Sequence, residues 1–286
     1  MKKSTQLIHR LVLLLKLDNL ISKLNSKIPW LYKLLPTHNE YPENTIKRIN
    51  LSNINFELEV NDYMQWYIYA NIKDPLWEIS YSKIKPGSII LDVGANVGAY
   101  SLQCASNIWI RKINAQIIAF EPNPKIFENL NNNISINKNL KPYINIENIA
   151  ISEKNGQNNF VINENNSGSG HLTRDDTGIS VNTKTIDYYL STNKINGISV
   201  IKIDVEGSEP LVINGAINTI NSYRPALLIE ITDSWFKSIG WSEIEIREKL
   251  KGLGYGLFVY GKNNLLNITN SNKEFLYQYN LLAIPE

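Results

Sequence analysis

The sequence predicts an α/β fold with one doubly wound, mostly parallel sheet and helices on both of its faces. Two observations predict this fold class. From residue 88 onward, short β-branched apolar runs alternate with segments of helical spacing, which is typical of strand–helix–strand units. Near the carboxyl end, two apolar runs follow one another without a helix between them, which indicates an antiparallel hairpin at the edge of the sheet.

The expected elements take their bounds from apolar runs, glycines and prolines. The first buried strand is introduced by Pro86 and Gly87 and ends at Gly94, and the second stops at Glu121 and Pro122. Seven strands are expected, over residues 88–93, 116–120, 144–150, 198–204, 226–231, 255–260 and 275–284, with a further β-like run over 159–162. Helices are expected over residues 97–106, 124–133, 210–221 and 241–250.

Residues 1–50 are expected to form a helical N-terminal extension, and residues 51–286 one domain, since the chain is long enough for one large core. The apolar run at residues 11–15 is too short to span a bilayer, and no cleavage site of a signal peptide follows it. The wider segment has the spacing of an amphipathic helix. Three surfaces can receive it: the core, a second copy in a homodimer, or a membrane surface reached through Lys2, Lys3, Arg10, Lys16 and Lys23.

The composition limits the class of partner. A total of 29 Lys and Arg against 27 Asp and Glu gives a net charge of +2, too weak a field to argue for nucleic acid. We therefore expect a small-molecule partner in a local pocket. The single cysteine, Cys104, cannot form an internal disulfide or a thiolate metal site, and the expected compartment is the cytoplasm.

A glycine loop and an acid follow the first two strands. The loop from Asp92 to Gly98 lies at the start of a helix, where glycines let backbone N–H groups approach a ligand. It lacks the third glycine of the dinucleotide fingerprint, which counts against NAD. Glu121 follows 23 residues after Gly98, at a place where a carboxylate can bind both ribose hydroxyls. The pair predicts a nucleoside-binding half-site; the alternative is that Glu121 only ends its strand in solvent.

Further acids end the later strands, and they are the candidates for a general base. Asp204 and Glu206 follow one strand and Glu230 ends the next, so all three are expected at the same mouth of the sheet. Asp204 and Glu206 share a direction only if the strand continues through them, and the alternative role for such acids is to cap the following helix. His171, in the irregular segment 158–187 with its Gly-Ser loop 167–170, is the other candidate base.

Three stretches together resemble the FkbM-type methyltransferases: Leu91 to Gly98, Phe120 to Pro124, and Ile201 to Glu209. Weaker echoes, among them Trp77-Glu78, extend the resemblance over roughly residues 75–285. It implies a Rossmann-like class I methyltransferase fold with a seven-stranded sheet, the cofactor S-adenosyl-L-methionine, and an acceptor hydroxyl on a sugar or a polyketide-type product.

The resemblance also implies roles for residues. Gly94, Ala95 and Asn96 would line the methionine and ribose end, Glu121 would hold the ribose, and residues 148–150 would border the adenine. Asp204 would lie beside the transferring methyl, with Glu206 and Glu230 facing the acceptor. The full expected cofactor-binding set is Glu78, Asp92, Gly94, Ala95, Asn96, Gly98, Glu121, Pro122, Asn148 and Ala150.

The leading hypothesis is therefore O-methylation of a sugar, glycan or secondary metabolite. The alternatives are an NAD-dependent oxidoreductase and a nucleoside-binding module without turnover. No metal ion is expected, although Asp204, Glu206 and His171 carry ligand atoms suited to a hard divalent ion in a metal-assisted variant.

Overall fold

The apolar runs form one mixed sheet of eight strands in the computed structural model, which describes residues 3–163, 166–173, 175, 177–262, 264–271 and 278–286. Across the sheet the order is β13 (Leu265–Asn267), β12 (Tyr255–Tyr260), β14 (Tyr279–Pro285), β11 (Ala226–Ile231), β10 (Ile198–Ile203), β3 (Ile89–Val93), β4 (Gln116–Phe120) and β5 (Ile144–Glu147). The five strands from β11 to β5 are parallel, which confirms the predicted α/β class.

The antiparallel pair at the carboxyl end is present, but it does not stand alone at the edge. β14 lies between β11 and β12 and pairs antiparallel with both, so its backbone is hydrogen-bonded on two sides. The short strand β13 adds an eighth strand beyond β12. The residues predicted to begin the last strand, 275–277, lie outside the described part of the chain.

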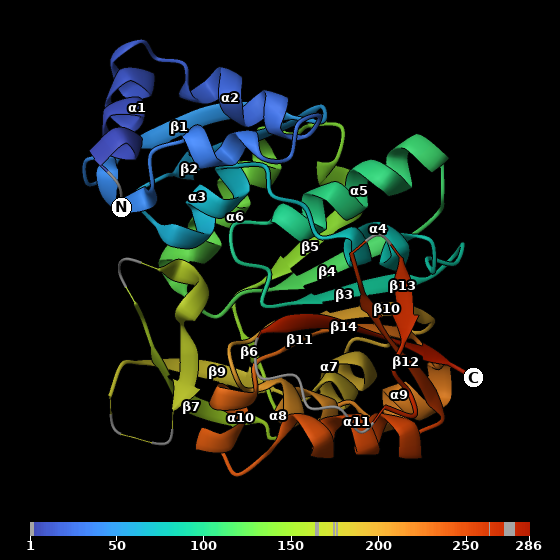
Figure 1. Ribbon diagram of the computed structural model, residues 1–286. Helices are drawn as coiled ribbons and strands as arrows, with labels where there is room; N and C mark the ends of the chain where they lie inside the picture. Colours follow the sequence, from blue (N-terminus) through green and yellow to red (C-terminus); the bar gives the residue numbers. More distant parts are fainter. Residues whose placement is uncertain (1–2, 164–165, 174, 176, 263, 272–277) are drawn as a thin grey trace.

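Helices cover both faces of this sheet, each over its own apolar cluster (Figure 1). One face carries α4 (Pro75–Tyr81), α5 (Ala99–Arg111) and α6 (Pro124–Ser135). The other carries α7 (Ile186–Thr192), α8 (Glu209–Asn214), α9 (Ile217–Tyr223), α10 (Asp233–Ser238) and α11 (Glu243–Gly252). The strands between them are buried on both faces, as their nearly continuous apolar sequences predicted.

Two predicted elements are divided. The helix expected over 210–221 breaks into α8 and α9 at Gly215, whose carbonyl accepts the backbone N–H of Asp187 while the Asp187 carboxylate caps α9 through Asn218 and Thr219. A β-carbon at Gly215 would lie 2.2 Å from the Ser152 carbonyl oxygen, which explains the glycine. The strand expected over 144–150 ends at 147, because residues 150–151 join a second sheet.

The second sheet accounts for most of the segment that looked irregular. It has four strands in the order β6 (Ala150–Ile151), β9 (Ile179–Lys184), β7 (Gly156–Val161) and β8 (His171–Thr173). The β-like run predicted over 159–162 lies largely in β7. The Gly-Ser loop forms a short 3₁₀ helix, η4 (Ser167–Ser169).

The N-terminal part begins with the predicted helices and continues into elements that the sequence did not indicate. These are α1 (Lys3–Leu14), α2 (Asp18–Asn25), the 3₁₀ turns η1 (Leu31–Leu34) and η2 (His38–Glu40), the hairpin β1 (Ile46–Leu51) and β2 (Ile54–Glu59), and α3 (Tyr63–Tyr69); a later 3₁₀ turn is η3 (Lys141–Tyr143). The predicted boundary at residue 50 falls inside β1 and stays a prediction. Among the described residues, no helix is both long enough and apolar enough to cross a membrane.

The hairpin is held to the sheet domain by two asparagines, one on α6 and one just after it. The Asn133 carbonyl oxygen accepts the backbone N–H of Glu57 at 2.8 Å, and its amide donates to the Val97 carbonyl at 3.0 Å. Asn137 makes a similar pair of bonds to the backbone of Asn55. The side chain of Asn133 is fully buried, so this amide joins β2, α6 and the loop before α5 in one network.

Replacing Asn133 with alanine removes two hydrogen bonds and leaves their backbone partners without a donor or acceptor. We expect a loss of about 2–4 kcal/mol in the free energy of unfolding, measured by urea denaturation. The control is Asn131→Ala at an exposed position of the same helix, which should change stability by less than about 0.5 kcal/mol. Equal stability of the two variants would contradict the role given to Asn133.

Candidate active site

A cavity of about 270 Å³ opens where the strand order reverses. The chain runs from β3 outward through β4 to β5, and then returns to the other side of β3 to form β10 and β11. The loops that follow β3 and β10 therefore lead to helices on opposite faces of the sheet, and open α/β sheets bind their ligands at such a point. The predicted residues Gly94, Ala95, Asn96, Glu121, Pro122, Ala150, Asp204, Glu206 and Glu230 all line the cavity.

The glycine loop after β3 is shaped by packing within the protein. The backbone N–H groups of Gly94 and Ala95 both donate to the Phe120 carbonyl, at 3.1 and 2.9 Å. Gly94 has a φ of 79°, and a β-carbon there would lie 1.8 Å from the Asp204 carbonyl oxygen. The glycine is thus required because two strand ends touch, and not because N–H groups at 94 and 95 face a ligand, as the sequence had suggested.

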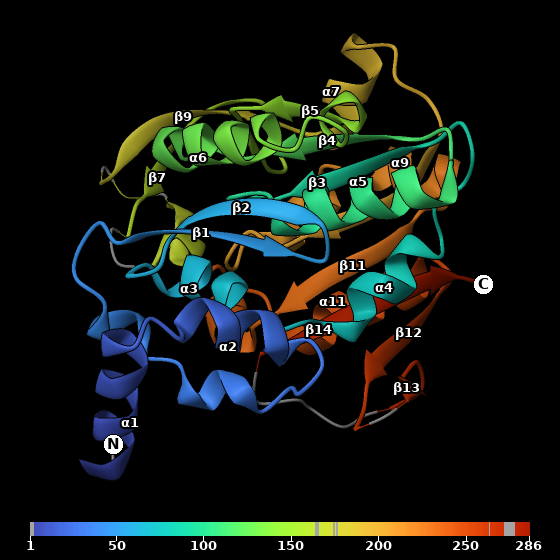
Figure 2. The same cartoon turned by 90° about the horizontal axis from the view of Figure 1, so that it is seen from above.

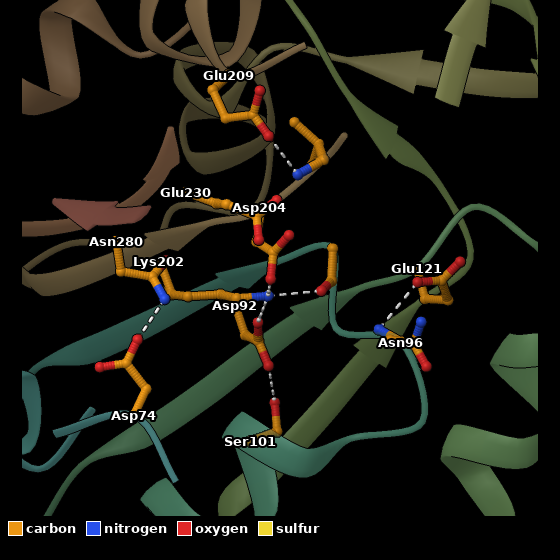
Figure 3. Close-up of polar contacts among 12 residues, drawn as sticks. Asp74, Asp92, Asn96, Ser101, Glu121, Lys202, Asp204, Glu209, Glu230 and Asn280 are labelled. Carbon is orange, nitrogen blue, oxygen red and sulfur yellow. Dashed lines mark hydrogen bonds and ion pairs between the residues drawn. The ribbon is translucent and has the colours of Figure 1, made fainter. Parts of the chain in front are cut away.

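Glu121 is buried at the end of β4, with 6% of its surface exposed, so the alternative of a solvated strand end is wrong. One carboxylate oxygen accepts the backbone N–H of Asn96 at 2.9 Å (Figure 3). The other accepts the backbone N–H of Asn123, also at 2.9 Å. Burial raises the pKa of Glu121 to about 7, although both backbone N–H groups and Lys202 act to lower it. The two backbone hydrogen bonds fix the direction of the carboxyl group, which lines the cavity.

A buried ammonium group joins the ends of β3 and β10. Lys202 is only 5% exposed, and its Nζ donates to the Gly94 carbonyl at 2.7 Å. It also lies 3.3 Å from Asp92 Oδ1 and 3.2 Å from Asp204 Oδ2 (Figure 3). Burial alone would lower the pKa of Lys202, but the two carboxylates outweigh it and raise the pKa above the ordinary lysine value. Asp92 accepts a second bond, from Ser101 Oγ at 2.6 Å.

The three predicted acids meet beside this lysine. One oxygen each of Asp204, Glu206 and Glu230 lie within 4.8 Å of one another. β10 ends at Ile203, so the strand does not continue through Glu206; instead Glu206 has a φ of 53°, and this left-handed turn brings its carboxyl group back to Asp204.

Two of the three acids hold their protons strongly. Burial, followed by the neighbouring carboxylates, raises the pKa of Glu206 to about 9. The same causes raise the pKa of Glu230 well above its ordinary value, against a hydrogen bond of 2.5 Å from Gln278. Of these three acids, only Asp204 has an ion pair with Lys202. The trio therefore combines two acids with raised pKa values and one acid that is paired with a lysine.

Glu209, which the sequence analysis assigned to no site, holds the loop that carries these acids. It is 1% exposed, and its two oxygens accept the backbone N–H groups of Val205 and Gly207 at 2.8 and 2.9 Å. Burial raises the pKa of Glu209 to about 7. Its signal in the sequence was its place as the last residue of the Asp-x-Glu-x-x-Glu run, where an acid can bind the open N–H groups of a turn.

The remaining wall comes from elements far apart in the sequence. Tyr63, Met64 and Ile68 of α3 line the cavity, as do Trp77 and residues 166–170 of the Gly-Ser loop. Asp62 fastens that loop to α3, since its carboxylate accepts both the backbone N–H and the hydroxyl of Ser167, at 2.5 and 2.8 Å. Sequence reasoning identified the loop as functional but gave no sign of its partner on α3.

Five residues that the sequence predicted for the site do not line the cavity. Asp92 is buried beneath the loop, and Gly98 packs against Leu130 on α6. Glu78 is exposed on α4, and Asn148 donates to the carbonyls of Glu121 and Pro122 from the outside. The ring of His171 packs edge-on against Trp235 at 4.9 Å, while residues 170 and 172 on either side of it line the cavity. Their roles in binding or catalysis stay predictions.

Oxygen atoms at the spacing of the acid trio suit a hard divalent cation. In this arrangement Glu230, and not His171, is the third group beside Asp204 and Glu206. Lys202 already supplies a positive charge to Asp204. The expectation that the site works without a metal ion stays a prediction.

The raised pKa values predict how stability depends on pH. The carboxyl groups of Glu121, Glu206 and Glu209 bind protons more tightly in the folded chain than at the ordinary value of 4.5. Their stabilising effect is present below pH 4.5 and is lost as the pH rises through 7 to 9. We expect Glu206→Gln to reduce the fall in melting temperature between pH 6 and pH 9 by on the order of a few °C. The exposed Glu128→Gln is the control, and parallel curves for wild type and Glu206→Gln would refute the assignment.

Comparison with known protein families agrees with this geometry. Residues 92–257 match the family model described as Methyltransferase FkbM domain. The chain is 26% identical over 144 residues to the hexuronic acid methyltransferase AglP of Haloferax volcanii, which covers 50% of this chain and 55% of that protein. It is 29% identical over 158 residues to the 2-O-methyltransferase NoeI of Sinorhizobium fredii, covering 49% of this chain and 62% of that protein.

Among solved structures, the chain is similar to the methyltransferase FkbM from Methylobacillus flagellatus KT, with a TM-score of 0.47 and 15% identity over 77% of this chain and 52% of that one. The chain spans less than two thirds of the length of the two curated relatives, AglP and NoeI. The family model covers more than half of the chain, and on that match the chain belongs to the FkbM-domain methyltransferase family.

Proposed function

We propose that this chain is an S-adenosylmethionine-dependent O-methyltransferase whose acceptor is a hydroxyl group of a sugar or glycan. The observation that carries the proposal is the meeting of two half-sites in one cavity: a buried glutamate on an apolar wall, and a trio of acids of which one, Asp204, is paired with Lys202. Family membership supports methyl transfer, and the names of the two curated relatives support a sugar acceptor.

The residues present fit the cofactor. Pro122, Ile149 and Ile151 give an apolar surface suited to an adenine ring, and Glu121 lies beside it with its carboxyl group fixed for ribose hydroxyls. The acid trio lines the same cavity and offers oxygen atoms for hydrogen bonds to the acceptor. When bound, S-adenosylmethionine supplies an electrophilic methyl group on a positively charged sulfur, and S-adenosylhomocysteine is the product.

The protein's part in the reaction is to orient the acceptor hydroxyl and take its proton. As the new carbon–oxygen bond forms and the sulfur–methyl bond breaks, the hydroxyl proton passes to a carboxylate of the trio. We assign this step to Asp204, because it is the member paired with Lys202 and exposed enough to reach a substrate. The raised pKa values of Glu206 and Glu230 favour their protonated forms, which can donate hydrogen bonds to neighbouring oxygens of a polyhydroxylated acceptor.

Changing Glu121 to alanine should weaken cofactor binding. Calorimetric titration of the wild type with S-adenosylhomocysteine is expected to give micromolar affinity, and Glu121→Ala should lower it by about tenfold or more, because a hydrogen bond to a charged group contributes about 1.5–3 kcal/mol. NAD, titrated in parallel, should not bind. Failure of S-adenosylhomocysteine to bind, or a preference for NAD, would remove the basis for the methyltransferase assignment.

Changing Asp204 to asparagine should mainly reduce turnover. We expect kcat for methyl transfer to sugar acceptors to fall by about 10²-fold or more, with a smaller change in the KM for S-adenosylmethionine, since general base catalysis is worth about that much. Glu128→Gln on α6 is the surface control, and assays with EDTA and with added magnesium separate any requirement for a metal ion. Wild-type turnover by Asp204→Asn would show that another group takes the proton.

A further inference from the structure

The N-terminal helices expose an unusual share of the protein's apolar surface. Ten of the twenty large apolar side chains that are exposed in the described part of the chain lie between residues 7 and 30. They are Leu7, Ile8, Leu11, Leu14, Leu15, Leu17, Leu20, Leu24, Ile28 and Trp30, which we call the N-terminal apolar surface. Leu14 is 76% exposed and Leu7 61%. A concentration of this kind marks a binding surface.

The exposed side chains form a stripe, because they recur at helical spacing. On α1, Leu7, Leu11 and Leu14 stand at intervals of four and three residues and therefore share one face. The opposite side of the same helix faces the protein: Val12 is buried, and His9 Nδ1 lies 2.7 Å from Glu40 Oε2. The stripe is therefore not the side on which α1 packs, and Figure 2 shows α1 standing out from the body of the fold.

The segment is held by apolar contacts of Leu13 and Ile21 with the core and by polar contacts, none of which uses the exposed stripe. On α2, Asp18 is ion-paired with Lys47, and the Ser22 hydroxyl donates to the Tyr69 carbonyl. The Asn25 amide donates to the Ala70 carbonyl at 2.8 Å. The bonds from Ser22 and Asn25 anchor α2 at the end of α3, the helix whose side chains line the cavity, whereas Asp18 binds α2 to β1. The N-terminal apolar surface is therefore linked to one wall of the candidate active site.

The distribution of charge indicates whether this surface binds a second copy of the chain or a lipid bilayer. Residues 1–30 contain six Lys and Arg and one Asp, a local charge of +5, whereas the whole chain has +2, which leaves −3 on residues 31–286. In a symmetric dimer the same patch meets itself, so two segments of +5 would be brought together. An apolar stripe with basic flanks is instead suited to an anionic lipid surface, into which the stripe inserts while Lys and Arg meet the headgroups.

We propose that residues 3–30 are a peripheral membrane-binding surface that takes a bilayer containing anionic lipids. The stripe enters the boundary between headgroups and acyl chains, and α2 holds the cavity wall formed by α3 near the bilayer. The proposal does not depend on the reaction that the site performs.

The test is flotation of the full chain with vesicles of phosphatidylcholine alone and of phosphatidylcholine mixed with phosphatidylglycerol. We expect binding to the mixed vesicles that weakens as salt is added. The double change Leu11→Glu and Leu14→Glu should reduce binding by about tenfold or more while leaving the melting temperature unchanged, because both side chains are exposed. Ile110→Glu is the matched control, since this residue of α5 is 66% exposed and lies far along the chain from the stripe.

Light scattering without lipid measures whether the chain forms a dimer through this surface instead. A dimer that the Leu11→Glu, Leu14→Glu variant dissociates, together with no vesicle binding by the wild type, would assign the surface to a second copy and overturn the proposal. Equal binding to both kinds of vesicle would overturn the requirement for anionic lipid. Equal loss of binding in Ile110→Glu would show that the effect is not specific to the N-terminal apolar surface.

Discussion

The site depends on the burial of one ammonium group, that of Lys202, at the adjacent ends of β3 and β10. Removing a lysine charge from water costs several kcal/mol, and the cost is offset only when carboxylates and carbonyls surround it closely. Here Asp92, Asp204 and the carbonyl of Gly94 do so, within 2.7–3.3 Å. Because these partners belong to two different motifs, the lysine fixes the glycine loop relative to the acid-bearing loop.

The same charge gives similar carboxyl groups different properties. Asp204 has a cation beside it, whereas burial and mutual repulsion raise the pKa values of Glu206 and Glu230. The trio therefore contains one carboxyl group that is paired with a cation and two whose raised pKa values favour the protonated form. A proton acceptor and hydrogen-bond donors arise next to each other from carboxyl groups alone, because their surroundings differ.

Much of this could be predicted from the sequence, because the informative residues stand at strand ends. Apolar runs located the strands of the parallel sheet, and the edge where they end brings Glu121, Asp204 and Glu230 together. Lys202 also left a signal that was not used: a lysine inside a buried run requires a buried anion, and Asp92 occupies the paired position on β3. The apolar runs could not explain why residue 94 is a glycine. The reason is its contact with the Asp204 carbonyl, which depends on how two loops pass each other.

The rest of the cavity wall could not be predicted, because it is built by contacts without a local pattern. Asp62 is recognisable as a helix cap, but its bonds to Ser167 cross 105 residues of chain. This wall also lies partly outside the family: α3 precedes the matched residues 92–257. The strand ends that carry Gly94, Glu121 and Asp204 lie within the matched residues, whereas α3, which also lines the cavity, lies outside them.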